Sequence, residues 1–157
     1  MTESAEPGGD PHAANSWENY KHVHDDWMER HPFIVEDHLE WEFVGDPPKI
    51  IRLRGWVVCQ ENVVVTVEKM LIVHGTRNGR LLVQGERYAY NAHFVNRYNI
   101  LRYDNGHADP EEFHRHQFDL QTGRETSKAI IGLRDMPTLG AFLTEVAQVI
   151  GFPIEGF

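Results

Sequence analysis

Three histidines, an arginine and an aspartate lie within one fifteen-residue segment of the chain. It reads Arg102-Tyr-Asp104-Asn-Gly-His107-Ala-Asp-Pro-Glu-Glu-Phe-His114-Arg-His116. Histidine titrates near neutral pH, so two of them can supply the base and the acid of one reaction. An aspartate beside a histidine fixes the tautomer of its ring, and an arginine can hold a phosphate through two hydrogen bonds. These five side chains are therefore catalytic candidates for metal-free phosphodiester transfer, in which a 2′-hydroxyl group of RNA attacks its own phosphate.

The same side chains could instead bind a metal ion. His114 and His116 are two residues apart, so a strand would present both on one face, with Asp104 as a third ligand. A His-x-His pair is a short motif, however, and Arg102 with Asp104 could be a simple surface ion pair. We expect the site to need no cofactor, and we keep the metal site and a purely structural role as alternatives.

Two strands would bring the candidate residues together. Residues two apart in a strand share a face, so strands over residues 98–104 and 113–120 would each present two of the candidates on one side. The dipeptide Asn105-Gly106 favours a turn after the first strand, which places His107 in the connecting loop. If the two strands form an antiparallel pair, four of the five side chains meet on one face.

Four further residues are candidates for binding at this site. Asn105 and Arg115 lie within the fifteen-residue segment itself. Tyr88 and Tyr90 share one face of the preceding strand and could form the floor or the flank of the site. Alternation along that strand extends their face to Leu82, Gln84, Glu86 and Phe94.

Alternating apolar and polar residues predict a sheet that presents this segment. Strand patterns fall at about residues 33–44, 49–60, 63–73, 80–94, 98–104 and 113–120, and residues 124–131 could add a short edge strand or a loop. Apolar residues recur at helical spacing from Leu139 to Ile150, between a suitable cap at Thr138 and a stop at Gly151. The sequence therefore predicts an α+β fold: an antiparallel sheet of five to six strands covered by a C-terminal helix, with an acidic N-terminal leader.

The negative charge of the chain is concentrated in that leader. The formal net charge is −9, and residues 1–48 hold twelve of the 24 acidic residues but only two of the 15 basic ones. We divide the chain into a disordered acidic tail (1–16), a leader helix and strand (17–48) and an α+β body (49–157) that carries the Arg/Asp/His site. Ser16 could cap the leader helix. The body is nearly neutral, so RNA remains a candidate ligand.

Composition also narrows the setting of the protein. No run approaches 18 apolar residues, so we expect no membrane partner. The single cysteine, Cys59, lies in an apolar run, which rules out an intrachain disulfide and favours a cytoplasmic location. A homo-oligomer is compatible with this composition.

The motif resembles the signature of the TumE-like toxin family. Members carry an Arg-aromatic-Asp-Asn segment, then a histidine, then a histidine-rich run; the matching segments here are Arg102-Tyr-Asp-Asn-Gly-His107 and Phe113-His-Arg-His116. The resemblance covers about residues 49–150 and includes the two tyrosines and the C-terminal helix. In this chain Glu111-Glu112-Phe113 stand ahead of the histidine run, where the family has proline and a further histidine, and Arg115 stands where lysine is usual.

The resemblance implies a small cytoplasmic toxin of a toxin–antitoxin system, with a helix-turn-helix antitoxin protein as its partner. Ribonuclease activity is then an inference from the side chains. Two other functions stay open: a non-catalytic protein-binding module that docks through its acidic leader, and a His/His/Asp metal-binding protein. The toxin with ribonuclease-like chemistry is the interpretation that uses all five catalytic candidates.

Overall fold

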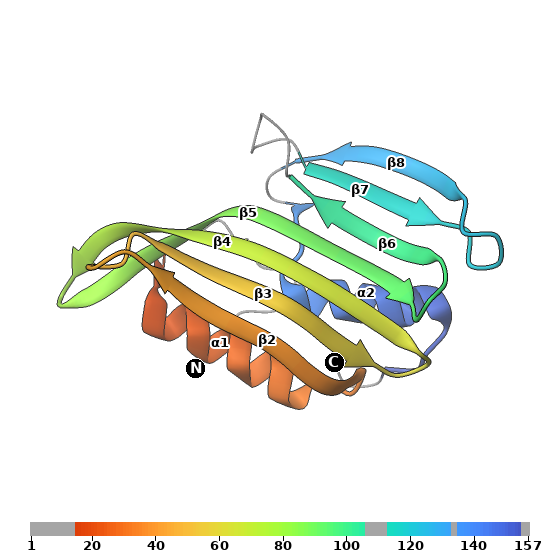
Figure 1. Cartoon of the computed structure of the whole chain (residues 1–157), viewed down its shortest axis with the longest axis horizontal. Helices are drawn as coiled ribbons and strands as arrows, with labels where there is room; N and C mark the ends of the chain where they lie inside the picture. Colours follow the sequence, from red (N-terminus) through yellow and green to blue (C-terminus); the bar gives the residue numbers. More distant parts are fainter. Residues whose placement is uncertain (1–14, 106–112, 133–134, 155–157) are drawn as a thin grey trace.

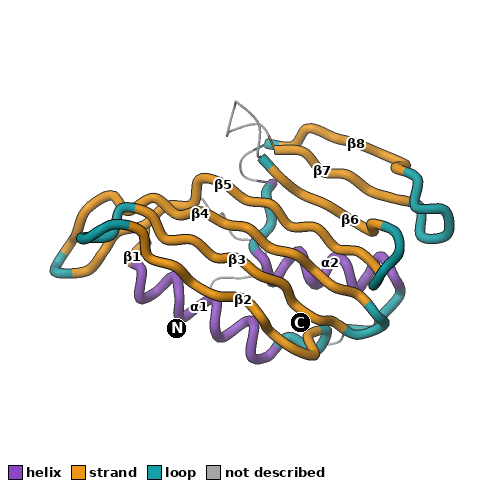
Figure 2. Tube along the Cα trace, in the orientation of Figure 1, coloured by secondary structure: helices purple, strands orange, loops and turns teal. Residues whose placement is uncertain are grey.

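In the part of the chain that the structure describes, a twisted antiparallel sheet carries two helices on one of its faces (Figure 1). The computed structural model describes residues 15–105, 113–132 and 135–154. The long strands follow one another across the sheet in chain order, from β2 to β8, and the short β1 pairs with β5. Figure 2 shows that helices α1 and α2 lie on the same side of the sheet. In the described part of the chain no helix covers the other side, which we call the open face.

The elements have the following bounds. The strands are β1 (Asn15–Ser16), β2 (Ile34–Val44), β3 (Ile50–Cys59), β4 (Val63–Arg77), β5 (Arg80–Phe94), β6 (Asn99–Asp104), β7 (Phe113–Phe118) and β8 (Glu125–Ile131). The helices are α1 (Trp17–Arg30) and α2 (Leu139–Ile150). The predicted α+β class, the antiparallel sheet and the C-terminal helix are confirmed.

The predicted number of strands was too low, because the sheet has eight strands within the described residues rather than five to six. One added strand is β8, which pairs with β7 but is exposed on nearly every residue and therefore lacks a clear alternation of apolar and polar residues. The other is β1, whose two residues are too few to show a pattern. Asn15 and Ser16 fall in the segment predicted to be a disordered tail, and residues 1–14 lie outside the described residues.

Strand alternation separates a covered face from the open face. Along β4, Val63, Val65 and Val67 are buried toward the helices, while Thr66 and Glu68 are exposed on the open face. Removing such β-branched side chains from water is the main stabilisation available to a sheet of this size. The open face, by contrast, carries polar residues and is free to present a site.

Both helices begin where the sequence indicated. The hydroxyl of Ser16 accepts the backbone N–H of Asn19 at 3.2 Å, and the hydroxyl of Thr138 accepts that of Ala141 at 3.2 Å. Helix α2 ends at Gly151, whose φ of 81° is readily adopted by glycine. Predicted capping and observed capping agree because these signals are local.

A bulge in β5 overturns one part of the predicted alternation. The register between β4 and β5 shifts between Met70 and Leu71, so the buried residues change from Val83 before the bulge to Tyr88 after it. Residues 82, 84 and 86 therefore do not share the face of Tyr88. A prediction from sequence periodicity assumes an uninterrupted strand and cannot detect the extra residue of a bulge.

The leader helix and strand share the sheet and the core of the body. Strand β2 pairs with β3 from Ile34 to Val44, and Met28 of α1 belongs to the main hydrophobic core. The proposed boundary at residue 48 falls in the turn between β2 and β3.

Among the described residues, no helix is long and apolar enough to span a membrane.

Candidate functional site

Four of the five catalytic candidates lie together on the open face, in adjacent positions of β6 and β7. The antiparallel register pairs Arg102 with His116 and Asp104 with His114. Directly paired residues of neighbouring strands project to the same side of a sheet, so the four side chains form one cluster. The predicted strand pair and its shared face are confirmed.

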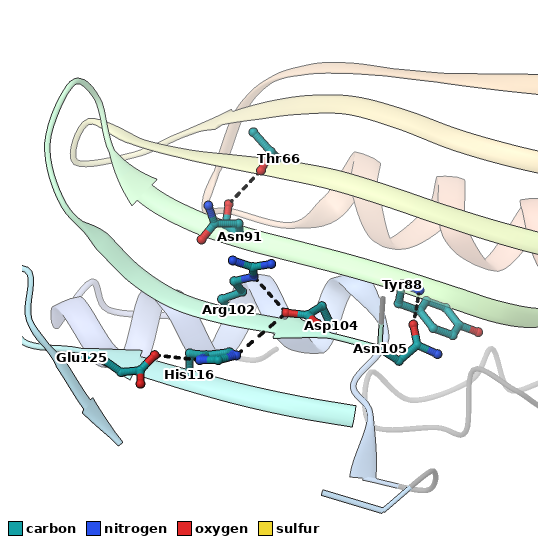
Figure 3. Close-up of polar contacts among 8 residues, drawn as sticks. All are labelled: Thr66, Tyr88, Asn91, Arg102, Asp104, Asn105, His116 and Glu125. Atoms are coloured by element: carbon teal, nitrogen blue, oxygen red, sulfur yellow. Dashed lines mark hydrogen bonds and ion pairs between the residues drawn. The ribbon is translucent and has the colours of Figure 1, made fainter. Parts of the chain in front are cut away.

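Asp104 is the centre of this cluster (Figure 3). Its Oδ2 atom accepts a hydrogen bond from Nε of Arg102 at 2.9 Å and lies 4.0 Å from Nε2 of His116. The Asp104 residue is only 3% exposed, whereas the Arg102 side chain is 49% exposed. One end of the arginine is thus fixed by a buried carboxylate, and its guanidinium remains accessible to a ligand.

Glu125 completes the cluster from the edge strand β8. Its Oε1 atom lies 2.7 Å from Nδ1 of His116, so both ring nitrogens of that histidine face a carboxylate, Glu125 on one side and Asp104 on the other. The sequence did not identify Glu125, because no local motif links it to His116. Pairing of residues 113–120 with 124–131 as a hairpin would have been the only available signal.

His114 provides a second imidazole beside the first. Its ring centroid lies 6.1 Å from that of His116, and the residue is 8% exposed. His107, the fifth catalytic candidate, lies outside the described residues, as do Glu111 and Glu112. Its predicted role remains a prediction.

Tyr88 and Tyr90 do not lie at this site. The β5 residues paired with Asp104 and Arg102 are Ala89 and Asn91, so the two tyrosines project to the covered face. The register between β5 and β6 fixes this orientation, and both tyrosines are fully buried among aromatic rings of the core. The prediction that they form its floor or flank was wrong.

Arg115 also projects away from the histidines that flank it. Its Nε donates to the hydroxyl of Tyr103 at 2.9 Å, and its guanidinium forms an ion pair with Glu145 of α2. Burial, together with the hydrogen bond to Glu145, raises the pKa of Tyr103 to about 12. Arg115 thus fastens the β6–β7 pair to α2 instead of binding a ligand on the open face.

The side chain of Asn105 forms hydrogen bonds with the backbone of β5. The residue is fully buried; its Oδ1 accepts the backbone N–H of Tyr88 at 2.8 Å, and its Nδ2 donates to the carbonyl of Glu86 at 2.7 Å. These bonds satisfy backbone groups next to the bulge of β5, where ladder pairing is interrupted. Asn105 therefore sets the position of Asp104 rather than contacting a substrate.

The donors of the alternative metal site do not converge. In residues 15–105, 113–132 and 135–154, no three histidine, cysteine, aspartate or glutamate side chains are placed to hold a metal ion. Asp104 is instead bound to Arg102, and His116 to Glu125. This arrangement suits proton transfer and anion binding better than coordination.

No protein-family model matches the chain, and neither a curated protein nor a solved structure shows significant similarity to it. The chemistry of the site is therefore argued from its own geometry. The geometry combines an accessible guanidinium, an imidazole hydrogen-bonded to a carboxylate, and a second, buried imidazole on the open face of the sheet.

Proposed function

We propose that this protein is the toxin of a toxin–antitoxin system and acts as a metal-independent ribonuclease. The observation that carries the proposal is the position of His116, between Glu125 and Asp104 and directly opposite the accessible Arg102. A general base, a group that stabilises charge and a general acid are the groups that phosphodiester transfer requires.

Glu125 determines which nitrogen of His116 can act as the base. A carboxylate accepts hydrogen bonds, and Glu125 lies 2.7 Å from Nδ1 whereas Asp104 lies 4.0 Å from Nε2. Nδ1 of the neutral ring therefore carries its proton toward Glu125, and Nε2 is left to accept one. Arg102 lies on the neighbouring strand, where its guanidinium can hold the phosphate whose charge increases in the transition state.

The proposed reaction replaces one phosphorus–oxygen bond with another. Nε2 of His116 takes the proton of the 2′-hydroxyl group, the 2′-oxygen bonds to phosphorus, and the bond from phosphorus to the 5′-oxygen breaks. Protonated His114 returns a proton to the leaving 5′-oxygen. The products are a 2′,3′-cyclic phosphate and a free 5′-hydroxyl group, with no metal ion or external water consumed.

The toxin role and the antitoxin partner derive from the resemblance of the Arg-Tyr-Asp-Asn and His-Arg-His segments to the TumE-like family. A helix-turn-helix antitoxin would be encoded beside this chain. Expression of the wild-type chain should arrest growth, and Arg102→Ala, Asp104→Asn and His116→Ala should each relieve the arrest. A harmless parent, or full toxicity of all three variants, would contradict the toxin proposal.

The ribonuclease activity is tested with purified protein freed of its affinity tag. A labelled single-stranded RNA should be cleaved in the presence of EDTA and should yield 2′,3′-cyclic phosphate ends. His116→Ala should lower the rate by about 10²- to 10⁴-fold, the usual contribution of one acid–base group. An RNA with 2′-deoxy substitution at the cleaved position should resist cleavage, because the nucleophile is missing.

His74→Ala is a matched control, since His74 is an exposed histidine near the C-terminal end of β4. It should cleave RNA at the wild-type rate. Activity that survives in His116→Ala would exclude His116 as the base. Glu125→Gln should show an intermediate loss, because glutamine can still bond Nδ1 but carries no charge.

A second function, a non-catalytic protein-binding module, is favoured by the acidic surface of the edge strand β2. Glu36, Asp37, Glu40 and Glu42 are all exposed there. Deleting residues 1–48 would also remove β2 and part of the core, so neutralisation of these four carboxylates is the better test. Binding of a lysine-rich peptide that disappears in this variant would support the module.

A further inference from the structure

The strand registers place seven residues in a single line across the open face, which we call the cross-strand row. From β2 to β8 its members are His38, Trp56, Thr66, Asn91, Arg102, His116 and Lys128. Each is paired with the next, so all seven project to the same side of the sheet. The row therefore runs from the exposed edge at β2, through the proposed catalytic residues, to the edge at β8.

The row carries no carboxylate, whereas the neighbouring row does. The next line of paired residues, two positions along each strand, includes Glu40, Arg54, Glu68 and Asp104. A polyanion on the open face would thus meet arginine, histidine and lysine along the cross-strand row and carboxylates beside it. This charge pattern favours a chain of phosphates that crosses the strands instead of following them.

Trp56 gives the row an aromatic surface. The residue is 48% exposed, although tryptophan is usually well buried, and it stacks on His38 with 5.0 Å between ring centroids. Gly55 makes this placement possible, because a Cβ atom at that position would lie 2.3 Å from the carbonyl oxygen of His38. An exposed tryptophan held in a fixed orientation is a surface on which an unpaired base can stack.

We propose that the cross-strand row binds single-stranded RNA, with a base stacked on Trp56 and the reacting phosphate at Arg102. The inference rests on the proposed ribonuclease function and names the form of its substrate. Three strand-to-strand steps separate the two residues, which is about 14 Å at the usual spacing of paired strands. A few unpaired nucleotides can span that distance, whereas the bases of a duplex are already stacked and closed to Trp56.

Binding is measured separately from cleavage with a fluorescently labelled oligonucleotide of about 12 nucleotides, within the site sizes of single-strand-binding domains. The oligonucleotide is 2′-O-methylated, so it has no nucleophile and stays intact during the titration. Trp56→Ala should weaken its binding by about 5- to 150-fold, as expected for the loss of one stacked base. Trp56→Phe should recover most of the affinity, because an aromatic ring is retained.

Phe43→Ala provides the matched control for an exposed aromatic residue. Phe43 is 47% exposed but pairs with the buried Ile51 and contacts Trp17, so it does not belong to the open face. Its affinity for the oligonucleotide should equal that of the wild type. Arg102→Gln should lower the slope of log affinity against log salt by about 0.7, which corresponds to one phosphate contact on a single strand.

The outcomes distinguish this inference from the ribonuclease proposal. Unchanged binding by folded Trp56→Ala, or equal affinity of the wild type for a duplex of the same sequence, would overturn the row as a single-strand site even if RNA is cleaved. Weaker binding by Trp56→Ala in a protein that never cleaves RNA would support the row and contradict the ribonuclease proposal. Far-ultraviolet circular dichroism establishes that each variant is folded.

Discussion

Lys69 carries a buried amine whose replacement tests the electrostatics of the core. It lies on the covered face of β4, is 5% exposed, and donates one hydrogen bond from Nζ to the hydroxyl of Tyr20 at 2.9 Å. The rings of Tyr20, Tyr88 and Tyr90 surround the amine at 5.2, 5.8 and 5.9 Å. Within the described part of the chain it forms no ion pair with a carboxylate. Burial therefore lowers the pKa of Lys69 from 10.5 to about 7.

The lowered pKa makes stability depend on pH in a defined direction. Between pH 7 and 10.5 the unfolded chain holds the Lys69 proton and the folded chain does not, so the free energy of unfolding rises with pH in that window. One pKa unit corresponds to about 1.4 kcal/mol, so the full effect is on the order of 5 kcal/mol. The linkage relation gives a gain of about 2 kcal/mol between pH 7 and 9, and almost no change between pH 6 and 7.

The assay compares the wild type with Lys69→Met, which keeps most of the side-chain volume but has no titrating group. Urea unfolding followed by tryptophan fluorescence gives the free energy of unfolding at pH 6, 7, 8 and 9. The difference between the two proteins isolates Lys69, because contributions of all other groups cancel if their surroundings are unchanged. We expect the variant to be the more stable protein at pH 7. Between pH 7 and 9 the free energy of unfolding of the wild type should rise by about 2 kcal/mol relative to that of the variant.

Lys128→Met is the matched control, because Lys128 is exposed on β8. It should follow the wild-type pH dependence throughout. A constant difference between the wild type and Lys69→Met from pH 6 to 9 would refute the reasoning, since it would mean that Lys69 has the same pKa in the folded and unfolded chain. Lower stability of the variant at every pH, with a difference that still changes with pH, would show that the tyrosine contacts outweigh the burial of charge.

The remaining predictions concern the framework of the site and its metal content. Asn105→Ala should lower the free energy of unfolding by about 2–4 kcal/mol, because two buried backbone groups lose their partners, and urea denaturation measures this. Tyr103→Phe removes a partly buried hydroxyl that bonds Glu145 at 2.7 Å and should lower stability by about 1–2 kcal/mol in the same assay. Gly55→Ala should abolish the native circular dichroism signal or lower the melting temperature by more than about 10 °C, because the new Cβ would clash with the His38 carbonyl. Metal analysis of untagged protein should find less than about a tenth of an equivalent of bound zinc or nickel.

Each of these has a result that would contradict it. An unchanged unfolding midpoint in Asn105→Ala would mean that water replaces the amide at the bulge of β5. A stable, native Gly55→Ala would show that β2 and β3 can separate locally without loss of the fold. Stoichiometric metal would favour the alternative site of His114, His116 and Asp104 over the hydrogen-bonded arrangement.

Local signals made much of the site predictable. Period-two spacing placed Arg102 with Asp104 and His114 with His116, and the turn after Asp104 implied that the two strands pair. The same alternation puts Arg115 on the opposite face from its neighbours. That this opposite face is covered by α2 could not be read from the strand, because it depends on where a helix 30 residues away packs.

Contacts between distant residues set the limits of prediction. Tyr88 and Tyr90 face the core because of the registers that β5 makes with β4 and β6, and a register is a property of two strands together. Glu125 reaches His116 only because β8 pairs with β7, and β8 is too exposed to show an alternating pattern. The line from Trp56 to Arg102 requires the registers of four strands at once.

Sequence alone was enough to locate the long strands, the C-terminal helix, the helix caps and the residue types available for chemistry, since propensity, periodicity and capping act within a few residues. Tertiary structure alone decided which of those residues share a surface. It gave His116 its carboxylate partner, buried Lys69 among tyrosines and aligned Trp56 with Arg102. The physical reason is that strand register and helix packing are fixed by burial of the whole sheet, to which every strand contributes.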